Sequence, residues 1–320
     1  MMNIKSNKPT VGVVGLGIIG SRAVANLRKS GHRVLTWSRT PKLQPNFLTS
    51  AAEVASGATV VEIFVSDGAA LLEVVRAMEP VLGSRHVVMN HATVSPKDTM
   101  EACRIVEARG ARFLDAPFTG SLEAADACAL VFMVGGEEKV LDGVRGILEV
   151  NGRCVLHVGP VGAGTVLKVA TNLIAATTVA AAAEGMALMS KAGVSLSKLP
   201  EVLAFHGVRS DLLASKVRRM ILDDFEPHFA LKHMLKDVGI AMDLAHEHGL
   251  KLAVAGGFAQ WAAEGIQAGW GDLDYAVVAK LFGYPDRGVV LDERVCEVLA
   301  KGEGGGGKGL GKGLLDFFKR

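Results

Sequence analysis

The chain has 320 residues, of which 49% are hydrophobic and 21% charged, and its formal net charge is +2. This length predicts two domains with enough apolar material for a sizeable core, and the composition is that of a soluble globular protein. With 35 basic against 33 acidic residues, the chain lacks the basic excess that marks nucleic-acid-binding proteins.

The four cysteines are Cys103, Cys128, Cys154 and Cys296. They form no CxxC pair, and no histidine lies at metal-ligand spacing from any of them. We therefore expect buried thiols in a reducing compartment, and no metal site.

Two features bear on cellular location. The N-terminal MMNIKSNKPT has no apolar signal core, so we expect a cytoplasmic protein. The Ala-rich stretch that starts near residue 163 has the length of a membrane span. Its many Ala, Gly and Thr residues and its internal Lys168, Asn172 and Glu184 argue against that reading, so we expect no membrane partner.

Apolar runs of strand type alternate with helical patterns through the first half of the chain. A glycine turn and a helical stretch ended by Gly31 follow the first run, and helical patterns also cover 69–79, 97–109 and 137–149. This alternation predicts an α/β domain with a doubly wound, mostly parallel sheet and helices on both faces. The strand-type runs lie at 11–15, 33–37, 59–65, 86–90, 111–115, 129–134 and 154–158.

The pattern changes at residue 159, after which we find no convincing strand. The proline-free run 163–192 would make a helix of roughly 45 Å at ~1.5 Å per residue. Lys168 and Asn172 lie four residues apart in it and so share one face. Taken alone, this polar pair marks either a solvated helix start or an active site. The helices expected here are 163–192, 197–205, 210–222, 230–248, 255–268, 275–282 and 291–300.

These patterns divide the chain into an α/β domain at 1–161, an interdomain helix at 162–192, an all-helical domain at 193–300 and a tail at 301–320. The Gly-rich part of the tail has the composition of a flexible linker. Its last residues, LLDFFKR, form either a short amphipathic turn that docks on a partner subunit or a disordered terminus. The large apolar surface of a helical half built on an Ala-rich helix predicts a homodimer or homotetramer.

The segment Gly15-Leu16-Gly17-Ile18-Ile19-Gly20 has the form GxGxxG and lies between the first strand and the first helix. In that context the glycines are typical of a dinucleotide-binding Rossmann loop. Gly15 permits the tight turn, Gly17 lets the backbone approach a pyrophosphate at the helix N-terminus, and Gly20 allows close packing of helix on sheet.

The end of the second strand predicts which dinucleotide binds. Enzymes that use NAD place Asp or Glu there to hold the ribose 2′-hydroxyl. This chain instead has Ser38-Arg39-Thr40, with no carboxylate from Trp37 to Ala52. The Arg39 guanidinium can bind a 2′-phosphate through two hydrogen bonds and stack on adenine, so we predict NADP(H).

Residues 11–285 resemble the β-hydroxyacid dehydrogenase family, and four segments carry the resemblance. The second is similar to the family's DAPVSGG substrate loop, and the third fits GxGxxxKxxxN with Lys168 as the catalytic lysine. Serine–arginine–threonine at 38–40, Gly120-Ser121 and GDLDYAVV at 271–278 look closest to the NADPH-dependent glyoxylate/succinic semialdehyde reductase branch. The four segments are GLGIIG, DAPFTGSLEAADA (115–127), GAGTVLKVATN (162–172) and LKHMLKDVGIA (231–241).

The resemblance implies hydride transfer between a nicotinamide and the carbonyl carbon of a small aldehyde or keto acid. Lys168 would stabilise the developing alkoxide and exchange its proton, and Asn172 would orient the lysine or contact the substrate. The implied cofactor residues are Gly15, Leu16, Gly17, Ile18, Ile19, Gly20, Ser38, Arg39, Thr40, Val65, Ser66, Thr93 and Lys236. The implied substrate residues are Thr119, Gly120, Ser121, Lys168, Asn172, Phe229 and Asp237.

The chain departs from the family pattern at several positions, which leaves the identity of the substrate open. Asn90-His91-Ala92-Thr93 stands for Asp-Met-Ser-Thr, Phe118-Thr119 stands for Val-Ser, and Cys128 and Gly68 replace the usual Gly and Pro. For His91 and His233 we expect supporting roles. Asp115 ends a strand, and we expect it to fix the loop that follows.

Two other functions remain as alternatives. One is a 3-hydroxyisobutyrate-type or other β-hydroxyacid dehydrogenase that works in the oxidative direction, which Arg39 disfavours. Imine reductases share the fold but lack the catalytic lysine, so Lys168 speaks against them. The other alternative is a dinucleotide-binding module that binds NADPH without turnover, which the joint presence of Lys168, Asn172, Thr119 and Asp237 disfavours.

Overall fold

The computed structural model describes residues 8–283. The chain forms two compact units, Met1–Thr171 and Asn172–Arg320, and the boundary between them falls inside one long helix. The expected helix at 291–300 and the tail at 301–320 lie outside the described residues.

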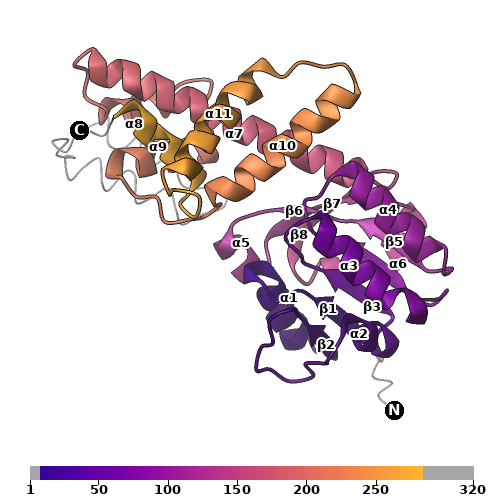
Figure 1. Cartoon of the computed structure of the whole chain (residues 1–320). Helices are drawn as coiled ribbons and strands as arrows, with labels where there is room; N and C mark the ends of the chain where they lie inside the picture. Colours follow the sequence, from indigo (N-terminus) through magenta and orange to yellow (C-terminus); the bar gives the residue numbers. More distant parts are fainter. Residues whose placement is uncertain (1–7, 284–320) are drawn as a thin grey trace. The chain divides into compact units, whose positions relative to one another are not determined.

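The first unit is built on one mostly parallel sheet, which confirms the predicted fold class (Figure 1). Its order is β2-β1-β3-β4-β5-β7-β6, and β8 also pairs with β7. The first five strands are parallel, whereas β7 runs antiparallel to β5 and β6. The strands are β1 (Val11–Val14), β2 (Val34–Trp37), β3 (Val60–Ile63), β4 (Val87–Asn90), β5 (Arg112–Asp115), β6 (Phe118–Thr119), β7 (Leu130–Gly135) and β8 (Gly152–Gly159).

Helices cover both faces of this sheet. Successive strand residues point to opposite faces, so apolar strands present apolar side chains on both. Val61 and Ile63 of β3 join a core with α2, α3 and α4, whereas Val60 joins one with α1, α5 and α6. A short 3-10 helix, η1 (Glu79–Val81), follows α3. The helices are α1 (Ile18–Lys29), α2 (Ala51–Gly57), α3 (Gly68–Met78), α4 (Pro96–Glu107), α5 (Leu122–Asp126) and α6 (Glu138–Leu148).

The carboxyl ends of the five parallel strands are in register. Val14 lies opposite both Trp37 and Ile63, Ile63 lies opposite Asn90, and Asn90 lies opposite Asp115. The loops that follow these strands therefore start from one edge of the sheet, where ligands bind in folds of this type.

Asp115 ties the start of helix α7 (Ala163–Lys191) to this edge. Its buried carboxylate accepts hydrogen bonds from the backbone N–H of Gly162 at 2.9 Å and of Thr165 at 2.8 Å. The expectation that Asp115 fixes the following loop needs correction, because these bonds reach the helix start some 50 residues away. A Cβ on Gly164 would lie 2.4 Å from the Met133 carbonyl oxygen, so the close approach requires glycine there.

The second unit is all-helical in its described part, residues 172–283, as predicted. One stripe of α7, which includes Ala176, Val179, Ala183 and Met186, is fully buried in the core of this unit. The stripe recurs every three to four residues, the period of one helix face. The other elements are α8 (Lys198–Leu203), α9 (Asp211–Leu222), α10 (Leu231–Glu247), α11 (Ala253–Gln267) and the 3-10 helix η2 (Tyr275–Phe282).

Length and composition alone would allow α7 to cross a membrane. Its hydropathy reaches 1.5 over an 18-residue window, and 28% of that window is buried. A single helix of this kind is weak evidence, because the core helix of a soluble protein passes the same test.

The expectation that the cysteines are buried is only partly correct. Cys103 is buried, and burial raises the pKa of its thiol to about 12. Cys128 and Cys154 are half-buried, because Cys128 follows the exposed end of α5 and Cys154 lies in β8, an outer strand of the sheet. None of these three forms a disulfide, and Cys296 lies outside the described residues.

Replacing Cys128 by glycine should stabilise the protein. Cys128 has φ of +55°, a left-handed conformation that is strained for residues with a Cβ. We expect Cys128→Gly to raise the free energy of unfolding by about 1 kcal/mol, measured by urea denaturation. Cys154→Gly, in the interior of a strand, is the matched control and should lower it by about 1 kcal/mol. A loss of stability in Cys128→Gly would contradict the strain.

Asp115 should also make stability depend on pH. Burial raises its pKa from 3.8 to about 6, although the N–H groups of Thr165 and Gly162 act in the opposite direction. Between these values the folded protein holds a proton that the unfolded chain has lost, so stability from this group falls as pH rises. The free energy of unfolding of Asp115→Asn, relative to wild type, should therefore rise from pH ~4 to ~7 by up to about 3 kcal/mol. Urea denaturation at both pH values tests this, and a pH-independent difference would contradict it.

Candidate active site

The glycine loop after β1 is shaped by two close contacts and one open position. Gly15 has φ of +96°, and a Cβ on it would lie 2.0 Å from the carbonyl oxygen of Phe64. A Cβ on Gly20 would lie 2.0 Å from the Gly15 carbonyl oxygen, whereas one on Gly17 would meet nothing within 4 Å. The outer glycines are therefore required by packing, and the middle one leaves the backbone open to a ligand.

The N-terminus of α1 carries no side-chain cap. Gly17 occupies the N-cap position, and the first turn contains no acidic residue. The next four helices, by contrast, are each capped by a side chain, from Ser50, Asp67, Ser95 and Ser121. Open backbone N–H groups and the positive end of the helix dipole suit a phosphate, so the loop fits a dinucleotide pyrophosphate. Of its other residues, Leu16 is buried and Ile18 is 68% exposed.

The turn after β2 presents Arg39 to solvent. The Ser38 hydroxyl donates to the Thr40 carbonyl oxygen at 2.5 Å and closes the turn. Arg39 is exposed, and no hydrogen bond or ion pair to another residue within 8–283 engages its guanidinium. The charge available at the end of β2 is therefore positive.

The loops after β3 and β4 are held by short side-chain contacts. The Ser66 hydroxyl donates to Asp67, and Asp67 in turn caps α3 by accepting from the N–H of Ala70. Val65, just before them, is half-buried. After β4, the side chain of Asn90 exchanges two hydrogen bonds with the backbone of Ala92, which fixes the turn that leads to the half-buried Thr93.

The expected substrate loop lies after β5. Thr119 is exposed in the two-residue strand β6, opposite Val131. Gly120 has φ of +137°, and a Cβ there would come within 2.8 Å of Leu130. The Ser121 hydroxyl accepts from the N–H of Ala124 and caps α5. The Thr119 hydroxyl, on the same loop, does not cap a helix among the described residues.

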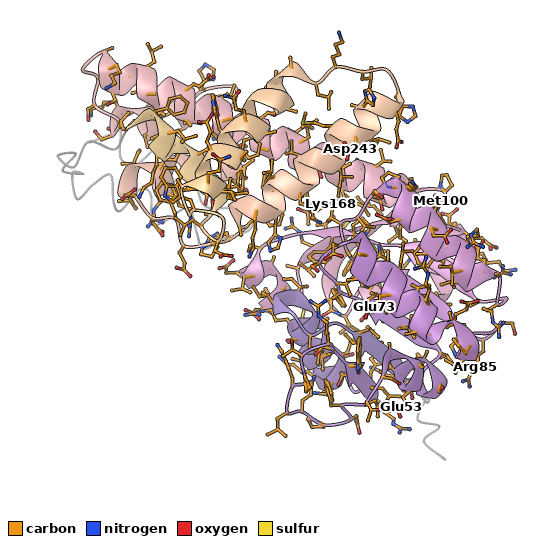
Figure 2. All side chains as sticks on the ribbon, in the orientation of Figure 1. Glu53, Glu73, Arg85, Met100, Lys168 and Asp243 are labelled. Carbon is orange, nitrogen blue, oxygen red and sulfur yellow. The ribbon has the colours of Figure 1, made fainter. Side chains whose placement is uncertain are left out.

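Lys168 lies in the first turns of α7 (Figure 2). One turn before it lies Thr165. The Thr165 N–H donates to Asp115, and the Thr165 hydroxyl lies 3.1 Å from the Thr99 hydroxyl. Lys168 is half-buried. Asp115 ends β5 at the edge of the sheet where the glycine loop follows β1, so its bond to Thr165 anchors at that edge the helix start that bears Lys168.

In the second unit, Asp237 contacts two other residues that the sequence predicts for the site, Asn172 and Lys236. The carboxylate of Asp237 is buried and accepts from the Asn172 side-chain amide at 2.6 Å. The Lys236 ammonium lies 3.0 Å from the other carboxylate oxygen and is 30% exposed. Because a carboxylate only accepts, this contact turns the NH₂ of Asn172 toward Asp237 and leaves its amide oxygen for another partner. Local sequence pattern does not reveal the pairing of Asn172 with Asp237, which lie 65 positions apart.

The backbone of Phe229 is bound by Asp274, which forms a buried ion pair with Lys216. Local sequence pattern does not reveal this pair. The Phe229 N–H donates to Asp274 at 3.2 Å, and Asp274 receives the Lys216 ammonium at 2.7 Å on both oxygens. Burial lowers the pKa of Lys216 and outweighs the effect of Asp274. The Phe229 ring contacts those of Tyr275 and His233. Burial and two neighbouring lysines lower the pKa of His233.

Within residues 8–283 no group of three His, Cys, Asp or Glu side chains could hold a metal ion. The polar groups at the sheet edge are instead backbone N–H groups, hydroxyls and the Lys168 and Arg39 cations. Such a set suits an anionic dinucleotide and a carbonyl compound that bears a carboxylate.

Comparison with known families agrees with this reading. Residues 10–159 match the NAD-binding domain of 6-phosphogluconate dehydrogenase. Residues 162–282 match the NAD-binding domain of NADP-dependent 3-hydroxyisobutyrate dehydrogenase. The two matches leave out only two residues between Val11 and Phe282.

Individual relatives are distant but cover most of the chain. Glyoxylate/succinic semialdehyde reductase 1 of Arabidopsis thaliana is 28% identical, over 84% of this chain and 96% of that protein. A Mycobacterium tuberculosis 3-hydroxyisobutyrate dehydrogenase, solved with L-serine, is 27% identical, with a TM-score of 0.81 over 86% of this chain and 99% of that one. The cytokine-like nuclear factor N-PAC of Anopheles gambiae is 30% identical over 76% of this chain, which spans 45% of that protein.

These matches agree with the two-unit fold and with the motifs in their order along the chain. The first unit is a nicotinamide-dinucleotide-binding domain, and the relatives that match over most of their own length include a reductase and a dehydrogenase. The chain belongs to the β-hydroxyacid dehydrogenase family.

Proposed function

We propose that this protein is an NADP(H)-dependent oxidoreductase that reduces a small aldehyde or keto acid of the glyoxylate or succinic semialdehyde type. The observation that carries the proposal is the pair Lys168 and Asn172 on successive turns of α7. The lysine follows the helix start that Asp115 anchors, and the amide is oriented by Asp237 at 2.6 Å. The similarity to the Arabidopsis reductase supports the substrate class.

The chemistry assigned to the chain's own residues follows from the charge that develops. A bound nicotinamide would supply the hydride for the carbonyl carbon, or take it up in the reverse direction. Negative charge then grows on the carbonyl oxygen, and the Lys168 ammonium stabilises it and donates the proton. In the oxidative direction the neutral amine takes that proton. The amide oxygen of Asn172, left open by the bond to Asp237, is the acceptor that orients the lysine.

The substrate carboxylate is assigned to the loop after β5. The Thr119 hydroxyl and the backbone N–H groups of Gly120 and Ser121 are donors that bind an anion without adding charge. The family resemblance assigns Phe229 and Asp237 to the substrate and Lys236 to the cofactor. Val65, Ser66 and Thr93 are assigned to the nicotinamide.

The preference for NADP(H) rests on Arg39. Its guanidinium is exposed and has no ion-pair partner among residues 8–283, and no carboxylate follows β2 that could hold a ribose 2′-hydroxyl. A planar guanidinium matches a phosphate with two hydrogen bonds.

We further propose a cytoplasmic homodimer or homotetramer without membrane or nucleic-acid partners. Two large apolar side chains of α7 support association, since Ile174 is 63% and Leu188 72% exposed. The near-neutral net charge of +2 argues against an anionic polymer as partner. Light scattering of the purified chain at several concentrations tests the assembly, and a monomer throughout would contradict it.

Two other functions have a specific relative in their favour. The similarity to the Mycobacterium tuberculosis enzyme favours oxidation of a 3-hydroxy acid. The similarity to N-PAC, which is named as a nuclear factor and not as an enzyme, favours a module without turnover. Steady-state kinetics with NADPH and NADH, over glyoxylate, succinic semialdehyde, methylglyoxal and 3-hydroxy acids, separates the three. Absence of turnover with every compound would reject both enzymatic functions.

Lys168→Ala should abolish most of the turnover and leave the cofactor bound. Loss of a general acid lowers kcat by about 10²–10⁴-fold, whereas the dissociation constant of NADPH, measured by fluorescence titration, should change by less than about twofold because Lys168 is assigned to the substrate. Lys191→Ala, in the last turn of the same helix, is the control and should retain wild-type kinetics. Loss of NADPH binding in Lys168→Ala would show that the lysine holds the cofactor.

Arg39→Gln should weaken the preference for NADPH over NADH. Removing a charge-assisted contact to the 2′-phosphate costs about 1.5–3 kcal/mol, so kcat/KM for NADPH should fall about 10–100-fold. The value for NADH should stay within about threefold, because NADH lacks that phosphate. Arg33→Gln, just before β2, is the control and should leave both values unchanged. An equal fall with both cofactors would remove Arg39 from the 2′-phosphate site.

A further inference from the structure

A pair of ionisable side chains is buried in the first unit, apart from the residues assigned above. Glu62 in β3 and His91 just after β4 both have fully buried side chains, and Nε2 of His91 lies 3.5 Å from Oε1 of Glu62. Neither oxygen of Glu62 nor Nε2 of His91 makes a hydrogen bond within the described residues. Glu62 is the one carboxyl group in the buried strand VVEI. Burying such a group costs stability, which points to a role other than packing.

The contacts of His91 define the state of its ring. Nδ1 lies 2.7 Å from the carbonyl oxygen of Ala116. A carbonyl oxygen can only accept, so Nδ1 carries a proton and donates it. Nε2 then faces the Glu62 carboxyl group, and this contact favours the ring orientation that aims Nδ1 at Ala116.

His91 thereby connects the supports of both ligand loops. Its ring stacks on Phe64 at 4.5 Å between centroids and meets the edge of Phe132 at 5.4 Å. Phe64 is the residue whose carbonyl oxygen excludes a Cβ at Gly15. Phe118, next to Thr119, contacts the same two phenylalanines at 6.3 and 6.1 Å. The His91 ring thus contacts Phe64, which packs against the glycine loop, and also hydrogen-bonds Ala116, where the loop that bears Thr119 begins.

We propose that the Glu62–His91 pair positions the loop 116–121. His91 holds the loop through its bond to Ala116, and Glu62 holds His91 in the required tautomer and orientation. The part of this inference that concerns the substrate carboxylate rests on the proposed function. The hydrogen bond itself is a property of the fold. Both are positioning residues, because they act through Ala116 and not on the substrate.

The decisive variant replaces both polar groups by apolar ones, as Glu62→Leu/His91→Phe. The phenylalanine keeps an aromatic ring between Phe64 and Phe132 but has no donor for Ala116. Stability should be equal or greater, because a buried polar pair is replaced by apolar packing. KM for the acid substrate should rise about tenfold, the effect of losing one hydrogen bond, with the NADPH dissociation constant within about twofold. Wild-type KM in this variant would overturn the proposal.

Two further variants separate positioning from general destabilisation. Glu62→Gln is the conservative variant, since its amide can donate to Nε2 and keep Nδ1 aimed at Ala116, so it should rescue KM to near the wild-type value. His86→Phe is the matched control: His86 is also buried and also bonds to the backbone, accepting from the N–H of Gly83 and facing the carbonyl oxygen of Ala55, but it precedes β4 at the opposite end of that strand. It should lower stability and leave KM unchanged. A raised KM in His86→Phe would show that the effect is not specific to His91.

Hydrogen–deuterium exchange gives a readout that does not depend on activity. Amides in 116–121 should exchange about tenfold faster in the double variant and at the wild-type rate in Glu62→Gln. Faster exchange without turnover in any assay would reject the proposed function and retain the positioning role, whereas unchanged exchange would reject the positioning role. In the wild-type protein, ¹⁵N shifts of His91 should show a protonated Nδ1 at neutral pH. An unprotonated Nδ1 would overturn the proposal even if the double variant fails to fold.

Discussion

The rest of the candidate site depends on two hydrogen bonds that the Asp115 carboxylate accepts from the backbone N–H groups of Gly162 and Thr165. They join the end of a central strand to the start of the helix that bears Lys168. Glycines at 135 and 164 are needed for them, since a Cβ on either would lie within 3 Å of Asp115 or its neighbours. A buried acid that accepts backbone N–H groups thus sets where the helix begins, and with it the place of the lysine.

The same arrangement recurs around the other residues assigned to the reaction. Asp237 orients Asn172, Asp274 holds the backbone of Phe229, and His91 holds the loop of Thr119. In each case a buried polar side chain binds a group on a more exposed segment. This division allows the exposed groups to vary with the substrate while the buried ones maintain the backbone, and it accounts for the chain keeping costly polar groups inside apolar layers.

The sequence predicted the features that depend on local pattern. The alternation of strands and helices, the glycine loop and the all-helical second half each follow from spacing within a short segment, and the structure agrees. The pairing of Asn172 with Asp237 joins residues 65 positions apart, and no local pattern reports it. The strand pattern does not distinguish Glu62 from its neighbours, because its partner His91 follows the neighbouring strand, β4. The half-burial of Cys128 and Cys154 depends on which strands and helices are outermost, which spacing alone does not reveal.

The uncapped start of α1 has a consequence for how long the protein survives. In α2, α3, α4 and α5 an N-cap side chain accepts one backbone N–H of the first turn, whereas the first turn of α1 has no side-chain acceptor. A dinucleotide bound there only in the folded state adds about 2.7 kcal/mol of stability at a hundred times its dissociation constant. The fraction of unfolded chain exposed to proteases therefore falls about a hundredfold when the cofactor pool is full. Cofactor binding at this helix start would thereby couple the amount of folded protein to the supply of the dinucleotide.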